Sequence, residues 1–223
     1  MLNKLKKAAL VGSGLLVLAG CSSESADDAS VNSEAVGAET LVVGLDDTFA
    51  PMGFRDENNE IVGFDVDLAK AVGERIGAEI VFQPIDWAMK ETELDSGNID
   101  MIWNGYAITP ERAEKVLLSE PYIVDAQSII VLKDSAIETK ADLEGKLVST
   151  QQSSSSVDKI MEDESGIFGK LGGDLVLYPS NNNAFSDLES GRVDAIVVGE
   201  VYGRYYMKQS GKDIYRVLED NFG

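Results

Sequence analysis

The chain has 223 residues, and its 39 acidic side chains outnumber its 19 basic ones, which gives a formal net charge of −20. This balance argues against nucleic acid as a partner, because phosphate binding needs clustered lysine and arginine. The sequence has no histidine and a single cysteine, Cys21. These counts exclude imidazole catalysis, an intramolecular disulfide and a multi-cysteine metal site, and we expect neither a metal nor a cofactor.

The first 20 residues have the pattern of a secretory signal peptide. Three lysines within residues 4–7 precede an apolar run, residues 8–20, that is too short to span a bilayer comfortably. The run ends in Leu18-Ala19-Gly20-Cys21, which resembles the lipobox of bacterial lipoproteins. That resemblance implies cleavage before Cys21 and attachment of diacylglycerol to its thiol, with palmitate as an expected acyl chain. The alternative is a plain signal peptide with a cysteine nearby.

Residues 21–40 are predicted to be the lipidated cysteine and a disordered tether. Residues 22–39 are rich in serine, alanine and acidic side chains and contain no aromatic or basic residue. No later segment is long and apolar enough to cross a membrane. We therefore expect a protein held by lipid on the extracytoplasmic face of the cell membrane.

From Leu41 onward, short β-branched runs alternate with segments of helical periodicity, which predicts an α/β fold with largely parallel sheets. In the first predicted helix, Val66, Ala69, Val72 and Ile76 share one face with Gly73, as expected of a helix packed on a sheet. The predicted elements in chain order are strand 41–43, helix 65–76, strand 80–83, helix 88–95, strand 101–103, helix 110–116, strand 128–132, strand 146–149, helix 156–164, strand 175–178, helix 182–189, strand 195–198 and helix 200–209.

One local repetition bears on the architecture. LDSGNIDMI at residues 94–102 resembles LESGRVDAI at residues 188–196. Each reads as a helix end, a glycine stop and an aspartate that opens a buried strand. The repetition predicts two sheets of similar build and hence two lobes, although a chance match of helix-to-strand punctuation is the alternative.

Seven segments taken together resemble the extracellular solute-binding proteins, family 3, of polar amino-acid ABC importers. They occur in the family's order and spacing and cover nearly all of residues 41–218. The resemblance implies an α/β, two-lobed, type II periplasmic-binding-protein-like fold, with ligand held in the cleft between lobe 1 (41–126) and lobe 2 (127–223). The segments are VGLDDTFAPM (43–52), GFDVDLAKAV (63–72), DW (86–87), GYAITPER (105–112), SEPY (119–122), DLEGK (142–146) and DLESGRVDA (187–195).

An amino acid presents a carboxylate, an ammonium group and a side chain, so its site needs three kinds of contact. Arg112 falls on the family's carboxylate-binding position, and a guanidinium matches a carboxylate with two parallel hydrogen bonds. The alternative is a solvated helix arginine paired with a glutamate. Gly105 and Ala107 match positions where the backbone meets the ligand, and Asn104 is expected to add a side-chain hydrogen bond.

The resemblance also places aromatic and acidic residues at the ligand's side chain. Phe49 and Trp87 match the two aromatic positions that enclose it, although such residues are often simply core. Asp46 matches an acidic position near its far end and favours a polar, basic or amide side chain. The alternative for Asp46 is a turn-forming aspartate after a strand.

In lobe 2, QQSSSSV at residues 151–157 aligns with the loop that closes over the carboxylate, with Gln151 and Ser155 on ligand-contact positions. The family usually has glycine where Ser153 stands, and a flexible serine linker is the alternative. After residue 198 the family commonly places an aspartate that binds the ligand's ammonium, whereas this chain has Gly199 and then Glu200. Either Glu200 reaches back to the ligand or it is an ordinary acid of a helix's first turn.

The sequence stops at about the point where the family makes its second crossing. We expect either a fragment or C-terminally truncated product, or a lobe 1 with an uncovered edge and apolar face, and in consequence lower stability and weaker binding than a complete family member has. The function that the resemblance implies is a monomeric lipoprotein that captures a polar amino acid and delivers it to an ABC permease in the membrane. One alternative is an enzyme like the cyclohexadienyl dehydratases, with Glu200 or Asp46 as general acid. Another is a surface sensor or adhesin domain.

Overall fold

A computed structural model describes residues 39–223 of the chain. The predicted signal peptide, Cys21 and nearly all of the predicted tether lie outside the described residues. Within residues 39–223, no helix is long and apolar enough to span a bilayer.

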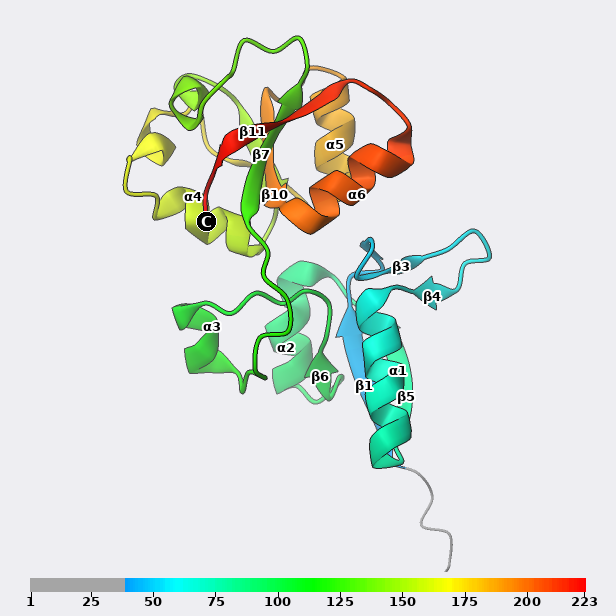
Figure 1. Cartoon of the computed structure of the whole chain (residues 1–223). Coiled ribbons are helices and arrows are strands. Elements are labelled where there is room, and N and C mark those ends of the chain that lie inside the picture. The colour runs from blue at the N-terminus through cyan, green and yellow to red at the C-terminus, as the bar shows by residue number, and fades with distance from the viewer. Residues whose placement is uncertain (1–38) are drawn as a thin grey trace, which may run out of the picture. The chain divides into compact units, whose positions relative to one another are not determined.

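The first lobe is built on a parallel sheet of β1 (Thr40–Leu45), β5 (Glu79–Pro84) and β6 (Met101–Ile102), with β1 in the middle (Figure 1). A separate antiparallel ribbon follows β1 along the chain. It consists of β2 (Thr48–Phe49), β3 (Gly53–Arg55) and β4 (Ile61–Val62). The helices of this lobe are α1 (Phe64–Ile76), the 3-10 helix η1 (Trp87–Met89), α2 (Lys90–Asp95) and α3 (Pro110–Lys115).

The second lobe contains a five-stranded sheet in the order β11-β7-β10-β8-β9. Four of its strands, β11, β10, β8 and β9, run in the same direction, and β7, which lies between β11 and β10, runs antiparallel to both neighbours. The expectation of largely parallel sheets therefore holds for the strand directions of this sheet, with β7 as the exception. The strands are β7 (Gln127–Leu132), β8 (Val148–Gln151), β9 (Val176–Tyr178), β10 (Ala195–Gly199) and β11 (Tyr215–Asn221), and the helices are η2 (Lys140–Leu143), α4 (Ser155–Met161), η3 (Ile167–Lys170), α5 (Asn181–Glu189) and α6 (Glu200–Ser210).

Strand periodicity explains why helices cover both faces of this second sheet. Successive side chains of a strand point to opposite faces, so a strand buried on both sides is apolar throughout. In β7, Ile129 and Val131 join a cluster with Ile160 of α4, whereas Ile130 joins a cluster with Phe185 of α5. Figure 1 shows β7 and β10 with α4 on one side and α5 and α6 on the other.

The repeated motif has the same structural role in both sheets. Each copy ends its helix at a glycine with φ of +71°, at Gly97 and Gly191. The aspartate that follows then ties its strand to a neighbour: Asp100 Oδ2 accepts from the Val42 amide at 2.7 Å, and Asp194 Oδ2 accepts from the Leu147 amide at 2.8 Å. The two copies therefore lie in two different sheets, as the repeat predicts, although these sheets differ in build, with three and five strands.

The buried face of α1 is narrower than the apolar stripe that the sequence predicts. Val66, Ala69 and Gly73 are buried against the sheet, but Val72 and Ile76 are 39% and 61% exposed. The first lobe therefore covers three of the five positions of the predicted apolar stripe and leaves the other two exposed.

Candidate functional site

A cavity of about 1160 Å³ lies at the carboxyl ends of the strands of both lobes. Asp46 and Asn104 follow β1 and β6 into its wall, and Gln151 and Gly199 end β8 and β10 on the other side. Ligands of open α/β sheets bind at such strand ends, because the strands stop there and loops supply polar groups. The cavity brings together every predicted ligand-contact residue except Glu200, namely Asp46, Phe49, Trp87, Asn104, Gly105, Ala107, Arg112, Gln151 and Ser155.

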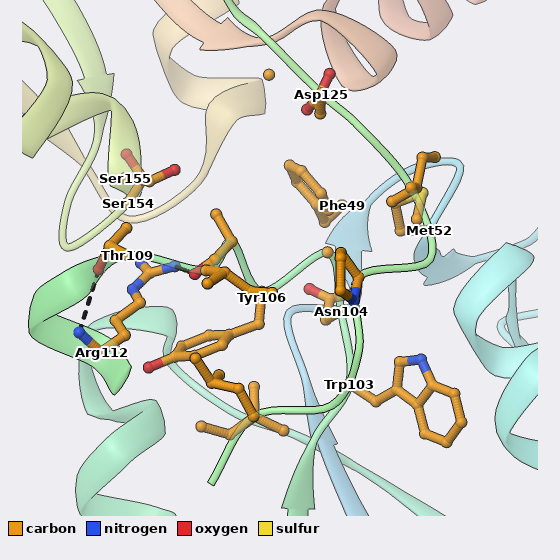
Figure 2. Close-up of a pocket in the computed structure, with 18 of the residues that line it drawn as sticks. Phe49, Met52, Trp103, Asn104, Tyr106, Thr109, Arg112, Asp125, Ser154 and Ser155 are labelled. Carbon is orange, nitrogen blue, oxygen red and sulfur yellow. Dashed lines mark hydrogen bonds between the residues drawn. The ribbon is translucent and has the colours of Figure 1, made fainter. Parts of the chain in front are cut away.

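Arg112 is held rigidly although it is charged and only 6% exposed. Thr109 caps α3 by accepting a hydrogen bond from the Arg112 amide, which fixes the helix start (Figure 2). The guanidinium lies 4.3 Å from the ring centre of Tyr106, and its Nη1 donates to the carbonyl of Ala107 at 3.0 Å. A planar cation fixed in this way presents its remaining N–H groups to the cavity at little entropic cost, as an anion site requires.

The carbonyl of Ser153 meets two cations of the other lobe. Arg112 Nη2 donates to it at 3.3 Å, and Lys90 Nζ donates to it at 3.0 Å. Ser153 has a φ of +54°, in the left-handed region that favours glycine, and this conformation gives a physical reason for the family's glycine at the position. Two cations on one neutral carbonyl form a contact that an anionic ligand group can replace.

Lys90 is a site feature that sequence reasoning missed. It is 2% exposed, and its ammonium contacts the Trp87 carbonyl at 3.2 Å, the Glu91 carboxylate at 3.1 Å and the Trp87 ring centre at 5.1 Å. Burial lowers the pKa of Lys90, although the neighbouring Glu91 opposes that shift. Nothing in the local sequence marks this lysine, because only its burial between two lobes gives it a role.

A second polar contact joins the lobes through Asp46 and Gln151. Gln151 Nε2 donates to Asp46 Oδ2 at 2.7 Å and to the Pro179 carbonyl at 2.9 Å, while its Oε1 accepts from Asn181 at 3.0 Å. Asp46 Oδ1 accepts from the amide and hydroxyl of Thr48. Burial raises the pKa of Asp46, and these hydrogen bonds partly offset that rise. Both predicted residues therefore lie at the site, but they are bonded to each other.

The two predicted aromatic residues line the cavity and already have aromatic neighbours. Phe49 stacks on Tyr202 of α6, with ring centres 5.1 Å apart and planes 9° apart. Trp87 is 7% exposed and meets the Tyr106 ring edge-on at 6.1 Å. Phe49 thus extends from lobe 1 onto lobe 2 as a further contact between the halves.

Gly105 is fixed by Asp65, which sequence reasoning did not select. The Gly105 amide donates to Asp65 Oδ2 at 2.7 Å, and the Tyr122 hydroxyl donates to Asp65 Oδ1 at 2.8 Å. Gly105 has a φ of +58°, and a Cβ there would lie 3.0 Å from the Phe49 ring, so both conformation and space favour glycine. Next to it, Asn104 Oδ1 accepts from the Asp46 amide at 3.2 Å.

The end of β10 differs from the expected arrangement. Glu200 is absent from the cavity lining, and its carboxylate pairs with Arg204 one turn further along α6. The acidic side chain that lies beside Gly199 at the end of β10 is that of Asp125. Its Oδ1 accepts from the Val201 amide at 3.0 Å, and its Oδ2 would lie 2.3 Å from a Cβ added to Gly199. Asp125 is exposed as a residue, and partial burial of its carboxyl at the start of α6 raises its pKa.

Two α/β lobes with a polar cavity at the carboxyl ends of both sets of strands define a two-lobed binding protein of the type II periplasmic-binding-protein-like fold. The comparison with known families then identifies the group: the sequence profile of the bacterial extracellular solute-binding proteins, family 3, matches residues 41–187. The chain belongs to this family.

Three similar proteins illustrate the range of the family. The L-cystine-binding protein TcyJ of Escherichia coli (strain K12) is 30% identical over 200 residues, which cover 88% of this chain and 73% of TcyJ. The arginine-binding extracellular protein ArtP of Bacillus subtilis (strain 168) is 32% identical over 178 residues, 78% of this chain and 66% of ArtP. A histidine-bound substrate-binding protein of an ABC uptake transporter from Streptococcus pneumoniae superposes with a TM-score of 0.78 at 38% identity, covering 80% of this chain and 74% of that one.

Proposed function

We propose that this chain is the substrate-binding component of an ABC importer and captures a polar α-amino acid between its lobes. The observation that carries the proposal is the buried guanidinium of Arg112, which is positioned by Thr109, Ala107 and Tyr106 and faces the cavity. A carboxylate is the natural partner of a planar cation that has two donors on one side.

In this proposal the ligand's carboxylate takes the place of the Ser153 carbonyl on Arg112. The neutral carbonyl is the weaker acceptor, because hydrogen bonds between ionised groups are roughly twice as strong as neutral ones. Lys90 keeps the Ser153 contact, so the two lobes remain joined while Arg112 binds the ligand. Binding then favours the closed arrangement, since only that arrangement brings both lobes to the ligand.

The side chain of the ligand is proposed to be polar, with a basic or amide group. Phe49 provides a flat ring beside the cavity, and Asp46 provides buried negative charge near it. The three similar proteins are described as binding cystine, arginine and histidine, all of them polar amino acids.

Delivery and anchoring complete the proposed function. The family relationship supports a permease partner in the membrane, and the Leu18-Ala19-Gly20-Cys21 motif supports lipid attachment at Cys21. Two or more acyl chains bind a bilayer firmly, which would keep the receptor near its permease. Mass spectrometry of the protein from membranes tests the anchor: acylated Cys21 at the mature N-terminus is expected, and an unmodified Cys21 contradicts it.

Isothermal titration calorimetry with the twenty L-amino acids and L-cystine tests the binding function. We expect at least one polar amino acid to bind. Arg112→Lys keeps the charge but loses the two-pronged contact, and we expect its affinity to fall about 10- to 100-fold. Arg75→Lys, on α1 and outside the cavity lining, makes the same substitution at an exposed arginine that bonds the Ala71 carbonyl, and this matched control should bind normally. No heat with any amino acid, or equal binding by the Arg112→Lys variant, overturns the proposal.

A further inference from the structure

We propose that Asp125 supplies the carboxylate that receives the ligand's α-ammonium group, and that residue 199 is glycine because the Asp125 side chain fills its space. The inference rests on the proposed amino-acid binding and assigns the second charged end of the same site. A zwitterionic ligand with its carboxylate on Arg112 needs an acceptor for three N–H bonds, and a buried ammonium without one is strongly disfavoured.

The other acidic residues of the cavity wall are engaged or remote from the strand ends. Among residues 39–223, the acidic side chains in the cavity lining are those of Asp46, Asp100, Glu120 and Asp125. Asp46 has both oxygens bonded, to Thr48 and to Gln151. Asp100 precedes β6, at the end of the strand opposite to Asn104, and binds the Val42 amide.

Asp125 differs from Glu120 in being held in place. Glu120 is an exposed residue whose carboxylate has no hydrogen bond among the described residues, whereas Asp125 Oδ1 accepts from the Val201 amide at 3.0 Å. That bond fixes one oxygen of Asp125 and leaves Oδ2 beside Gly199, in the cavity wall. A carboxylate with one anchored and one available oxygen is suited to receive a cation without reorganisation.

Gly199 and Asp125 form a matched pair. A Cβ on residue 199 would come within 2.3 Å of Asp125 Oδ2, a distance that real Cβ atoms do not reach, so any side chain there displaces the Asp125 carboxylate. The carboxylate therefore comes from the segment that leads into β7, in place of a side chain at the end of β10. Figure 2 shows Asp125 on that segment and Arg112 on α3, so the two opposite charges come from separate elements of the cavity wall.

Glu200 does not meet the same requirement. Its amide donates to the Ala126 carbonyl at 2.8 Å, which fixes the start of α6, and its carboxylate is bonded to Arg204 on the exposed side of that helix. A glutamate committed to an i,i+4 pair outside the cavity has to break that pair and turn inward before it can meet a ligand.

The experiment compares ligands that differ only in the α-ammonium group. Two pairs of ligands are titrated separately by calorimetry into the whole chain. L-arginine is compared with 5-guanidinopentanoate, and L-histidine is compared with 3-(imidazol-4-yl)propanoate. For whichever pair binds, Asp125→Asn should weaken the amino acid at least about tenfold and leave its deamino analogue unchanged, because only the former carries the charge that Asp125 meets. Glu200→Gln should leave both affinities at the wild-type values.

A second variant covers the case in which Asp125→Asn fails to fold. Gly199→Ala adds a methyl group against Asp125 Oδ2 and should produce the same selective loss for the amino acid, with a circular dichroism spectrum like that of the wild type. Equal losses for both members of a pair, or selective loss in Glu200→Gln, overturn the assignment to Asp125 while amino-acid binding stands. If wild-type protein binds no amino acid at all, the proposed function fails and this inference fails with it.

Discussion

Gln151 should control how far the lobes of the free protein separate. Its side chain is 3% exposed and makes three hydrogen bonds, of which only the 2.7 Å bond to Asp46 Oδ2 joins the two lobes. A buried hydrogen bond to a charged group contributes about 2 kcal/mol, and its loss leaves the carboxylate unpaired. Gln151→Leu, which keeps most of the volume, should therefore shift the ratio of closed to open molecules about 30-fold towards open, since 1.4 kcal/mol is a factor of ten.

The neighbouring residue provides a matched control. Gln152 Nε2 also bonds across the lobes, to Asp86 Oδ1, but at 3.3 Å and on the exposed surface, where a polar contact contributes little. Fluorophores placed on α1 and α5 would report the distance between the lobes without ligand. We expect a longer mean distance for Gln151→Leu and an unchanged one for Gln152→Leu. Equal distances for Gln151→Leu and wild type would refute the reasoning that this bond holds the lobes together.

Two further predictions concern stability. Because Ser153 has a φ of +54°, Ser153→Gly should be more stable than Ser153→Ala by about 1 kcal/mol in urea unfolding, and an alanine variant of equal stability contradicts this. Burial raises the pKa of Asp65, so the folded chain keeps that proton to higher pH than the unfolded chain does. The contribution of Asp65 to stability is therefore fully present below its ordinary pKa of 3.8 and falls as pH rises through the raised pKa. The unfolding free energy of wild type minus that of Asp65→Asn should decline over this interval, and a difference that rises with pH contradicts the sign.

The sequence predicts the long elements of the fold well, because their signal is local. Alternating apolar runs and helical stripes give the central strands of both sheets and, within a few residues, all six α-helices of residues 39–223. The short strands β2, β3 and β4 have too few residues to show a period, and β11 carries exposed charges at Glu219 and Asp220 that hide it. The direction of β7 depends on how the chain crosses between lobes, which local periodicity does not encode.

The site residues also fall into two groups, those that local sequence predicts and those that it does not. Arg112 and Gly105 could be selected because motifs surround them, and Gly105 also has the positive φ that its residue type suggests. Lys90 and Asp65 could not, because their importance arises from burial against residues distant in sequence. Asp125 had one indirect signal, the glycine at residue 199, but relating the two requires the close approach of segments 74 residues apart in the chain.

The most direct test of the central claim is a crystal structure of the chain with the amino acid that binds it most tightly in calorimetry. We predict electron density for the ligand in the cavity between the lobes, with its carboxylate within hydrogen-bonding distance of both Nη atoms of Arg112 and the Ser153 carbonyl no longer bonded to Nη2. A ligand whose carboxylate lies away from Arg112, or one bound outside this cavity, would contradict the account.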